Sequence, residues 1–374
     1  MIKALDVVLS YIRRMPAAKQ QEYGSRYLKD FLTFRRDLKL AYYSYQQMSK
    51  LRVLQDAESI KLSRDNGSLY EFRLGRDQDD ESQKIKAHVV LKADVRGSTE
   101  ITRLLVEKRL NPATHFSMNF FGPITKLLER FGAQKVFVEG DALILAVLET
   151  GSATTQSLTV ANACGLARKM LSVMEAQNSQ NRAYELPKLE LGLGIAFCDD
   201  APAYLYDEKR RIMISPAINQ ADRLSSCASE LRKDTSWRRS RRHRVEVMQN
   251  PAGESGKTGS LLRYNVNGID LDTPAFNKLK AEMVLHKVRL HSRSGDPHDY
   301  HAGRFMDRLG GAHWLVIREA GIKQWDEGGL SVLEGEDAGK FYEVVSDPDL
   351  VGRVKEKLSS KIKRRDASEM ADSF

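Results

Sequence analysis

Two aspartates that follow apolar runs carry the first chemical signal in this sequence. The apolar stretch 87–93 leads to Asp94, with Gly97 shortly after it, and the stretch 136–138 leads to Gly140 and Asp141. Two strands that each end in a carboxylate beside a glycine can bring both carboxylates to one edge of a sheet. Paired carboxylates near a glycine turn suit Mg²⁺ or Mn²⁺ held against a phosphate chain. The sequence therefore predicts a metal and phosphate site within residues 87–141.

The composition is that of an ordinary globular protein with a basic excess. The 374 residues are 41% hydrophobic and 29% charged, with a net charge of +9, and this length suits two or three domains. The sequence has no apolar run of about 18 residues and its N-terminus is charged too early for a signal peptide, so we expect no membrane partner and a cytoplasmic location. Three widely spaced cysteines predict neither a zinc site nor a disulfide framework.

Much of the positive charge lies in one basic run, residues 232–244. A solvated loop, a nucleic-acid surface, a surface that attracts a nucleoside triphosphate and a contact with a partner subunit are all compatible with such a run. Because no recognised nucleic-acid-binding motif accompanies it, we expect no nucleic-acid partner.

Hydrophobic periodicity predicts the elements that must position the two aspartates. Residues 1–85 form a helical N-terminal extension, with helix to about residue 55, and residues 273–374 form a C-terminal extension with strands and a basic terminal helix. Residues 86–272 form an α+β domain whose mainly antiparallel sheet is covered by helices on one face. The expected strands are 87–94, 134–139, 142–148 and 189–196, with a closing hairpin of 244–248 and 261–266, and the expected helices are 100–108, 115–131, 158–177 and 218–231.

Three motifs in this domain resemble those of the class III nucleotidyl cyclases. Residues 94–99 (DVRGST) resemble the first metal-binding motif of that family, and residues 135–141 (KVFVEGD) resemble the second, with its Gly-Asp at a hairpin tip. Residues 218–224 (INQADRL) resemble the helix motif, in which asparagine precedes arginine by four residues. The motifs occur in the family's order and cover about 86–270. The resemblance implies a class III cyclase-like fold and conversion of a nucleoside triphosphate to a 3′,5′-cyclic nucleotide and pyrophosphate.

The resemblance also implies a role for each matching residue. Asp94, Asp141 and the Val95 carbonyl would hold two divalent ions per active site, Mn²⁺ or Mg²⁺. Asn219 would orient the ribose, and Arg223 would stabilise the pentavalent phosphate with its fixed donors.

Phosphate binding is implied for a second group of residues. Small residues after the first aspartate let backbone N–H groups approach the phosphates, and a lysine in a glycine loop falls where the family places a triphosphate-binding lysine. These residues are Gly97, Ser98, Thr99 and Lys257.

Family members build each site between two subunits, one giving the aspartates and the other the Asn/Arg helix. This chain holds one copy of each motif. The resemblance therefore implies a homodimer with two equivalent sites.

Two positions depart from the pattern of the purine cyclases. Adenylyl types place a lysine four residues before the second metal aspartate and an aspartate seven before the helix asparagine, and Phe137 and Ile212 occupy those positions here. An apolar pair cannot hydrogen-bond the edge of adenine, and a phenyl ring would shrink the pocket in favour of a smaller base. Phe137 could instead be ordinary strand core, with base selection elsewhere.

The chain in this respect resembles the bacterial antiphage pyrimidine cyclases, which make cyclic UMP or cyclic CMP for a separate effector that responds to the cyclic nucleotide. UTP is then favoured over CTP as substrate. Two other functions remain open: a purine cyclase acting on ATP or GTP, and a non-catalytic cyclase-like module that binds nucleotide and regulates a partner. Intact residues at the four positions 94, 141, 219 and 223 favour an enzyme.

Overall fold

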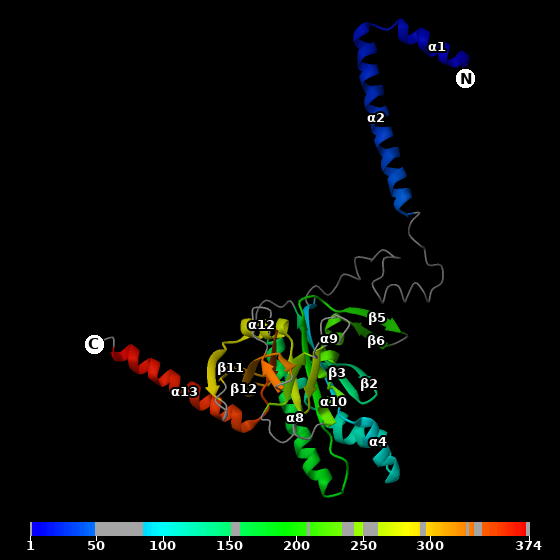
Figure 1. Cartoon of the computed structure of the whole chain (residues 1–374). Helices are drawn as coiled ribbons and strands as arrows, with labels where there is room; N and C mark the ends of the chain where they lie inside the picture. The colour runs from blue at the N-terminus through cyan, green and yellow to red at the C-terminus, as the bar shows by residue number, and fades with distance from the viewer. Residues whose placement is uncertain are drawn as a thin grey trace. The chain divides into compact units, whose positions relative to one another are not determined.

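The computed structural model of the chain describes residues 2–48, 85–150, 158–207, 210–233, 243–249, 261–291, 297–326, 329–332 and 339–371. It divides into two compact units, residues 1–77 and 78–374 (Figure 1). The described helices of the predicted N-terminal extension lie in the first unit, whereas all the predicted site residues lie in the second.

The first unit consists of two helices, α1 (Ile2–Arg13) and α2 (Ala17–Met48). The prediction of helix is confirmed here, with a break before α2 at Pro16, whose ring cannot continue a preceding helix. Nearly all of the described side chains of this unit are exposed, including large apolar ones such as Tyr27 and Phe34. Across the described ranges, no helix has the combination of length and apolarity that crossing a bilayer requires.

The centre of the second unit is a β-α-β-β-α-β arrangement. Its strands are β1 (Ile85–Val95), β2 (Ala133–Glu139), β3 (Ala142–Thr150) and β4 (Leu191–Cys198). They lie in the order β4-β1-β3-β2, and every adjacent pair among them is antiparallel. Helices α4 (Ser98–Glu107) and α8 (Thr159–Arg182) lie in the two crossovers. This is the strand order of a ferredoxin-like fold, and it confirms the predicted α+β class.

The sheet continues into the C-terminal part of the chain (Figure 1). Strand β9 (Gly268–Leu271) pairs parallel with β4, and four more antiparallel strands follow in the order β15-β12-β11-β10. These are β15 (Lys340–Val344), β12 (Ala312–Gly321), β11 (Pro297–Met306) and β10 (His286–His291). Four strands of the predicted C-terminal extension therefore share one nine-stranded sheet with the predicted catalytic domain.

Both faces of this sheet are covered, so the expectation of helices on one face was wrong. On the first face, α8 and α12 (Thr273–Glu282) pack on a large core that includes Leu91, Leu143 and Leu193. On the second face, α9 (Pro216–Ser225) packs on Val90, and α13 (Pro348–Ala371) packs on the far strands. Residues at alternate positions of β1 are buried on opposite faces, which produces its nearly continuous burial.

The second face also carries smaller sheets. The predicted hairpin is confirmed as β7 (Val245–Gln249) paired antiparallel with β8 (Leu261–Asn265). These strands join β13 (Lys323–Asp326) and β14 (Gly329–Val332) in a four-stranded sheet. Fully buried Arg318 on β12 holds this sheet in place, because it donates to Glu343 on β15 and to the carbonyl of Val245. Strands β5 (Ala203–Asp207) and β6 (Arg210–Ile214) form a separate hairpin.

Two predicted helices are divided in the structure. The stretch 115–131 contains α5 (Pro112–Phe116), a π-helical turn η3 (Ser117–Phe121), α6 (Gly122–Thr125) and α7 (Leu128–Phe131). Pro123 lacks a backbone N–H, so a regular α-helix cannot run through it unbroken. The stretch 218–231 contains most of α9 and the start of α10 (Ser229–Lys233), which are separate helices because the backbone becomes extended at Ser226.

Asp272 joins α12 to the sheet. Its carboxylate accepts hydrogen bonds from the backbone N–H groups of Ala275 at 2.7 Å and Phe197 at 3.4 Å, so it caps α12 and binds β4 at once. Burial raises the pKa of Asp272 to about 6, although both hydrogen bonds oppose the rise. The protonated form is thus favoured in the folded chain relative to the unfolded one.

We expect Asp272→Ala to lower the free energy of unfolding by about 1–2 kcal/mol, because the cap is lost. Asp272→Asn keeps an acceptor and removes the buried charge. The wild-type carboxyl contributes most stability below about pH 4 and loses it as pH rises through about 6. Asp272→Asn should therefore gain stability relative to wild type between pH 4 and pH 7, in denaturant titrations at several pH values. Parallel pH curves for the two proteins would contradict this assignment.

Candidate active site

The structure brings the two predicted carboxylates together. In the β1–β3 ladder Asp94 lies opposite Ala142, the residue directly after Asp141. Asp141 sits in the tight turn between β2 and β3, where Gly140 adopts a left-handed φ of 60° that glycine tolerates. Burial raises the pKa of Asp94, Arg96 opposes that rise, and the negative charge of Asp141 adds to it. The predicted edge of the sheet thus holds a pair of like charges.

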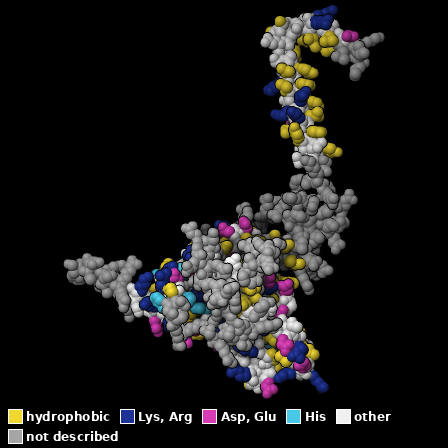
Figure 2. Space-filling model, viewed as in Figure 1, with side chains coloured by type: hydrophobic (Ala, Val, Ile, Leu, Met, Phe, Trp, Pro, Cys, Tyr) yellow, Lys and Arg dark blue, Asp and Glu magenta, His cyan; other side chains and the backbone are white. Residues whose placement is uncertain are grey.

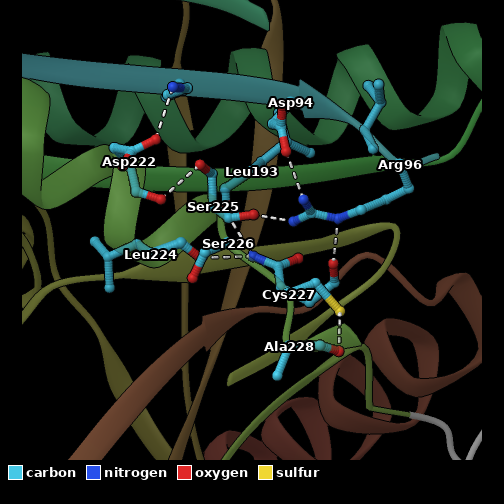
Figure 3. A network of polar contacts seen from close by, with 12 residues as sticks. Asp94, Arg96, Leu193, Asp222, Leu224, Ser225, Ser226, Cys227 and Ala228 are labelled. Carbon is cyan, nitrogen blue, oxygen red and sulfur yellow. Dashed lines mark hydrogen bonds and ion pairs between the residues drawn. The ribbon is translucent and has the colours of Figure 1, made fainter. Parts of the chain in front are cut away.

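Arg96 connects this edge to two distant segments (Figure 3). Its side chain is 6% exposed and its Nη1 donates to Asp94 Oδ2 at 2.6 Å. Its Nη2 donates to the carbonyl of Ser225 at the end of α9, and its Nε donates to the carbonyl of Asn265 on β8 at 2.9 Å. One guanidinium therefore joins the first motif to the helix that carries the third.

Glycines on β4 let α9 lie close against the sheet. A Cβ at Gly192 would overlap the guanidinium of Arg96, and a Cβ at Gly194 would overlap the carbonyl oxygen of Ala221. Any side chain at these positions would push α9 away from β4. The sequence Leu191–Cys198 thus sets the distance between the helix motif and the strand that carries Asp94.

Lys92 makes a second connection between the motifs. It precedes Asp94 by two residues on β1, so both side chains lie on the face that α9 covers. Its Nζ donates to Asp222 Oδ1 on α9 at 2.7 Å and to Glu139 Oε2 at the end of β2 at 3.0 Å. Burial alone would lower the pKa of Lys92, but these hydrogen bonds and charges raise it above its ordinary value. Lys92 therefore stays charged and ties β1, β2 and α9 together.

Asn219 and Arg223 lie on α9, before and after Asp222, the residue that binds Lys92. Both side chains are exposed, and the helix is fixed between them by Asp222. Among the hydrogen bonds and ion pairs of the described chain, none joins either side chain to Asp94 or Asp141. The single chain thus presents the Asn/Arg pair on its surface rather than closing it onto its own aspartates.

The predicted phosphate loop is a left-handed turn that opens α4. Gly97 has a φ of 67° at the N-cap, and Ser98 and Thr99 form the first turn of the helix. The guanidinium of Arg232, on α10, lies so close to Gly97 that a Cβ there would overlap it. This places a basic side chain beside the backbone N–H groups of the helix N-terminus, a combination that favours an anion.

The two predicted base-selecting residues are both exposed. Phe137 is 55% exposed on β2 and pairs with Ile144, which pairs in turn with Lys92, so Phe137 lies on the same face as Lys92 and Asp94. The β2–β3 register shifts between Lys135 and Phe137. Ile212 is 39% exposed on β6, a strand that passes near β2. Lys257 falls outside the described residues.

The donor set fits a divalent cation that arrives with phosphates. Asp94, Asp141 and the main-chain carbonyl of Val95 supply hard oxygen ligands, and the like charges of the two carboxylates would be relieved by a cation. No group of three or more His, Cys, Asp or Glu side chains that could hold a metal occurs in the described part of the chain. Mg²⁺ is commonly bound through one or two carboxylates together with substrate phosphates, so a pair suffices.

Three cations organise this region although their roles were not predicted from the sequence: Lys92, Arg96 and Arg232. Lys92 carried a detectable signal, because a lysine within an otherwise apolar strand must find a buried partner. Arg96 was read only as part of a motif, and Arg232 only as part of a basic run. The carbonyl acceptors of Arg96, at Ser225 and Asn265, and Gly97 beside Arg232 lie more than a hundred residues away in the sequence, so no local pattern reveals these contacts.

Solved structures similar to this chain include nucleotide cyclases. The adenylyl cyclase CyaB from P. aeruginosa matches with a TM-score of 0.39 and 16% identity, covering 70% of this chain and 95% of that chain. The guanylyl cyclase Cya2 matches with a TM-score of 0.36 and 17% identity, over 58% and 90%. The guanylate cyclase domain of RhGC from Catenaria anguillulae, in complex with GTP, matches with a TM-score of 0.35 and 11% identity, over 70% and 96%.

No family model and no curated protein matches the sequence. At TM-scores and identities this low, the family and the activity of this chain must be inferred from its own residues.

We expect Arg96→Ala to lower the free energy of unfolding by about 3 kcal/mol, because it leaves a half-buried carboxylate and two carbonyls without their donor. Arg103→Ala is the matched control, since Arg103 pairs with Glu100 and Glu107 on the exposed surface of α4. The control should cost less than about 1 kcal/mol. Denaturant unfolding measures both, and equal losses would show that Arg96 is not a structural centre.

Proposed function

We propose that this chain is a nucleotide cyclase of the class III type that converts UTP to 3′,5′-cyclic UMP and pyrophosphate. The observation that carries the proposal is the meeting of Asp94 and Asp141 at one sheet edge, tied through Arg96 and Lys92 to the helix of Asn219 and Arg223. Three motifs that resemble those of the class III cyclases thus form one connected region rather than scattered matches.

Asp94, Asp141 and the Val95 carbonyl would hold two divalent ions, Mn²⁺ or Mg²⁺. When bound, such ions neutralise the charge of the triphosphate and favour ionisation of a hydroxyl. Arg96 keeps Asp94 in place through a hydrogen bond to one carboxylate oxygen, Oδ2. The tight turn at Gly140 keeps Asp141 beside it.

In the proposed reaction, the ribose 3′-oxygen forms a bond to the α-phosphorus, the bond from that phosphorus to the bridging oxygen of the β-phosphate breaks, and the hydroxyl proton is released. The backbone N–H groups at Gly97, Ser98 and Thr99 would bind phosphate oxygens, and Arg232 beside them would add a charged donor. Lys257 is a further proposed phosphate ligand. Asn219 would orient the ribose, and Arg223 would stabilise the pentavalent phosphate.

We propose that each complete site forms between two copies of the chain. The exposed Asn219 and Arg223 make no bond to the aspartates of their own chain among the described contacts, which supports their use in the site of a second copy. The homodimer would then hold two equivalent sites, each with the aspartates of one copy and the Asn/Arg pair of the other.

The preference for a pyrimidine follows from the character of the two selector positions. Phe137 lies on the same face of the sheet as Asp94, two residues before Glu139. It presents a half-exposed ring instead of a hydrogen-bonding group. Ile212 is likewise exposed and apolar. Neither side chain can hydrogen-bond a purine edge, and the ring of Phe137 takes up space that a larger base would need. A cyclic pyrimidine nucleotide would serve as a messenger to a separate effector, as in the bacterial antiphage cyclases that the sequence resembles.

A competition assay tests the substrate. The full-length chain would be incubated with Mn²⁺ and equal concentrations of ATP, GTP, CTP and UTP, and the cyclic products would be separated by mass. We expect cyclic UMP to dominate. Mostly cyclic AMP or cyclic GMP would support the assignment as a cyclase and refute the base-selecting role of Phe137 and Ile212. No product from any nucleotide would favour the non-catalytic module.

Asp141→Asn tests the catalytic assignment separately from folding. Asparagine suits the turn as well as aspartate does, so the variant should unfold at the same denaturant concentration as wild type. Loss of one metal-binding carboxylate should reduce kcat at least about 100-fold. Asp349→Ala, which removes an exposed carboxylate at the start of α13, is the control and should leave turnover unchanged. Normal turnover by Asp141→Asn would refute the site.

A further inference from the structure

The long helix α2 carries a seven-residue apolar repeat. Starting at residue 27, large apolar or small side chains recur at alternating steps of four and three residues, which keeps them on one side of the helix. We call these six residues the α2 stripe: Tyr27, Phe31, Phe34, Leu38, Ala41 and Tyr45. A repeat of this period is typical of helices that wind around one another, because it averages 3.5 residues per turn.

Within residues 2–48, the described part of its unit, the α2 stripe is not covered. Its large side chains are between 45% exposed, for Phe31, and 71% exposed, for Tyr27. Figure 2 shows hydrophobic side chains along the length of α2. An α-helix of 32 residues is about 48 Å long, and helices in proteins draw most of their stability from packing such a face. The stripe therefore suits a partner helix of similar length and matching periodicity.

Charged residues beside the stripe indicate which partner fits. Asp30 directly precedes Phe31, and Arg35 directly follows Phe34, so they flank the stripe on opposite sides. In a parallel, in-register pair of identical helices, a residue at the position of Asp30 in the repeat faces the residue five positions further along on the other helix. Asp30 of each copy would then face Arg35 of the other, giving two complementary contacts by symmetry. An antiparallel pair would instead bring the flank of Asp30 and Asp37 against the same flank of its partner.

We propose that α2 pairs in parallel and in register with α2 of a second copy of this chain, as a two-stranded coiled coil closed along the α2 stripe. The proposal goes beyond the catalytic function, because α2 holds none of the proposed site residues. It gives the first unit the role of holding two chains together. The packing of aromatic side chains would bury the ring faces of Phe31 and Phe34, and the flanking charges would fix direction and register.

Cysteine crosslinking in the full-length chain tests orientation and register. Leu38→Cys places a thiol within the stripe, where a parallel in-register pair brings it against its own copy at disulfide distance. Arg36→Cys places a thiol on the outer side of α2 and is the matched control. Under mild oxidation we expect most of the Leu38→Cys chains to become crosslinked dimers, several-fold more than for Arg36→Cys. Equal crosslinking of the two variants, or none in either, would overturn the proposal.

A charge exchange tests the partner itself. Asp30→Arg places arginine against Arg35 of the other copy, and Arg35→Asp places aspartate against Asp30. Each substitution, added to Leu38→Cys, should lower crosslinking on its own. When the two variants are mixed, both contacts become complementary again, so crosslinked heterodimers should exceed homodimers several-fold. Random mixing, or crosslinking unaffected by either change, would overturn the proposed pairing.

These outcomes are separable from those of the catalytic proposal. The proposed catalytic dimer could hold two chains together without α2, so the mass of the particle would not discriminate, whereas a disulfide at position 38 reports on α2 alone. Cyclase activity with no crosslink would reject the coiled coil and keep the enzyme. A crosslink without cyclase activity would keep the coiled coil and reject the enzyme.

Discussion

The guanidinium of Arg96, buried between β1, the end of α9 and β8, is the interaction on which the rest of the candidate site depends. Its three acceptors come from residues 94, 225 and 265, which lie far apart in the sequence. A buried cation is costly unless each of its donors finds an acceptor. The strand with Asp94, the helix with Asn219 and Arg223, and the strand β8 must therefore assemble together. The position of the Asp94 carboxylate therefore depends on how α9 and β8 pack against the second face of the sheet.

Lys92, on β1 before Arg96, also joins segments that lie far apart in the sequence. Lys92 binds an acid from β2 and an acid from α9, so Lys92 on β1 and Arg96 directly after this strand both contact the helix that covers it. Most of the carboxylates on this face are already partnered, with Asp94 held by Arg96, and Glu139 and Asp222 held by Lys92. The Asn/Arg pair is left on a rigid helix with its side chains in solvent. Such preorganisation suits groups that must meet a ligand from outside their own chain.

The sequence predicted the proximity of Asp94 and Asp141 because that proximity depends on local features. A strand that ends at an aspartate and a two-residue turn with glycine are visible within a few residues. The α+β class and the hairpin of β7 and β8 were predictable for the same reason. The second covered face was not, since the position of α9 depends on Gly192 and Gly194 accepting a helix from another part of the chain. The role of Arg232 was not predictable for the same reason, because Gly97, which it lies beside, is distant in sequence. For Lys92 the sequence indicates a buried partner but does not identify Asp222 or Glu139.

The continuous nine-stranded sheet sets a limit on how this protein can be divided. Strand β15, which ends the series β10-β11-β12-β15, is hydrogen-bonded to β9. Strand β9 pairs with β4, and β4 pairs with the strand of Asp94. Truncation after residue 272 would remove four strands of this sheet and leave β9 as an open edge with unpaired N–H and C=O groups, a surface that templates aggregation. It would also remove Phe276 and Leu279 of α12 from the shared core. The three predicted motifs end near residue 224, yet the shortest folding unit that carries them extends into the C-terminal strands.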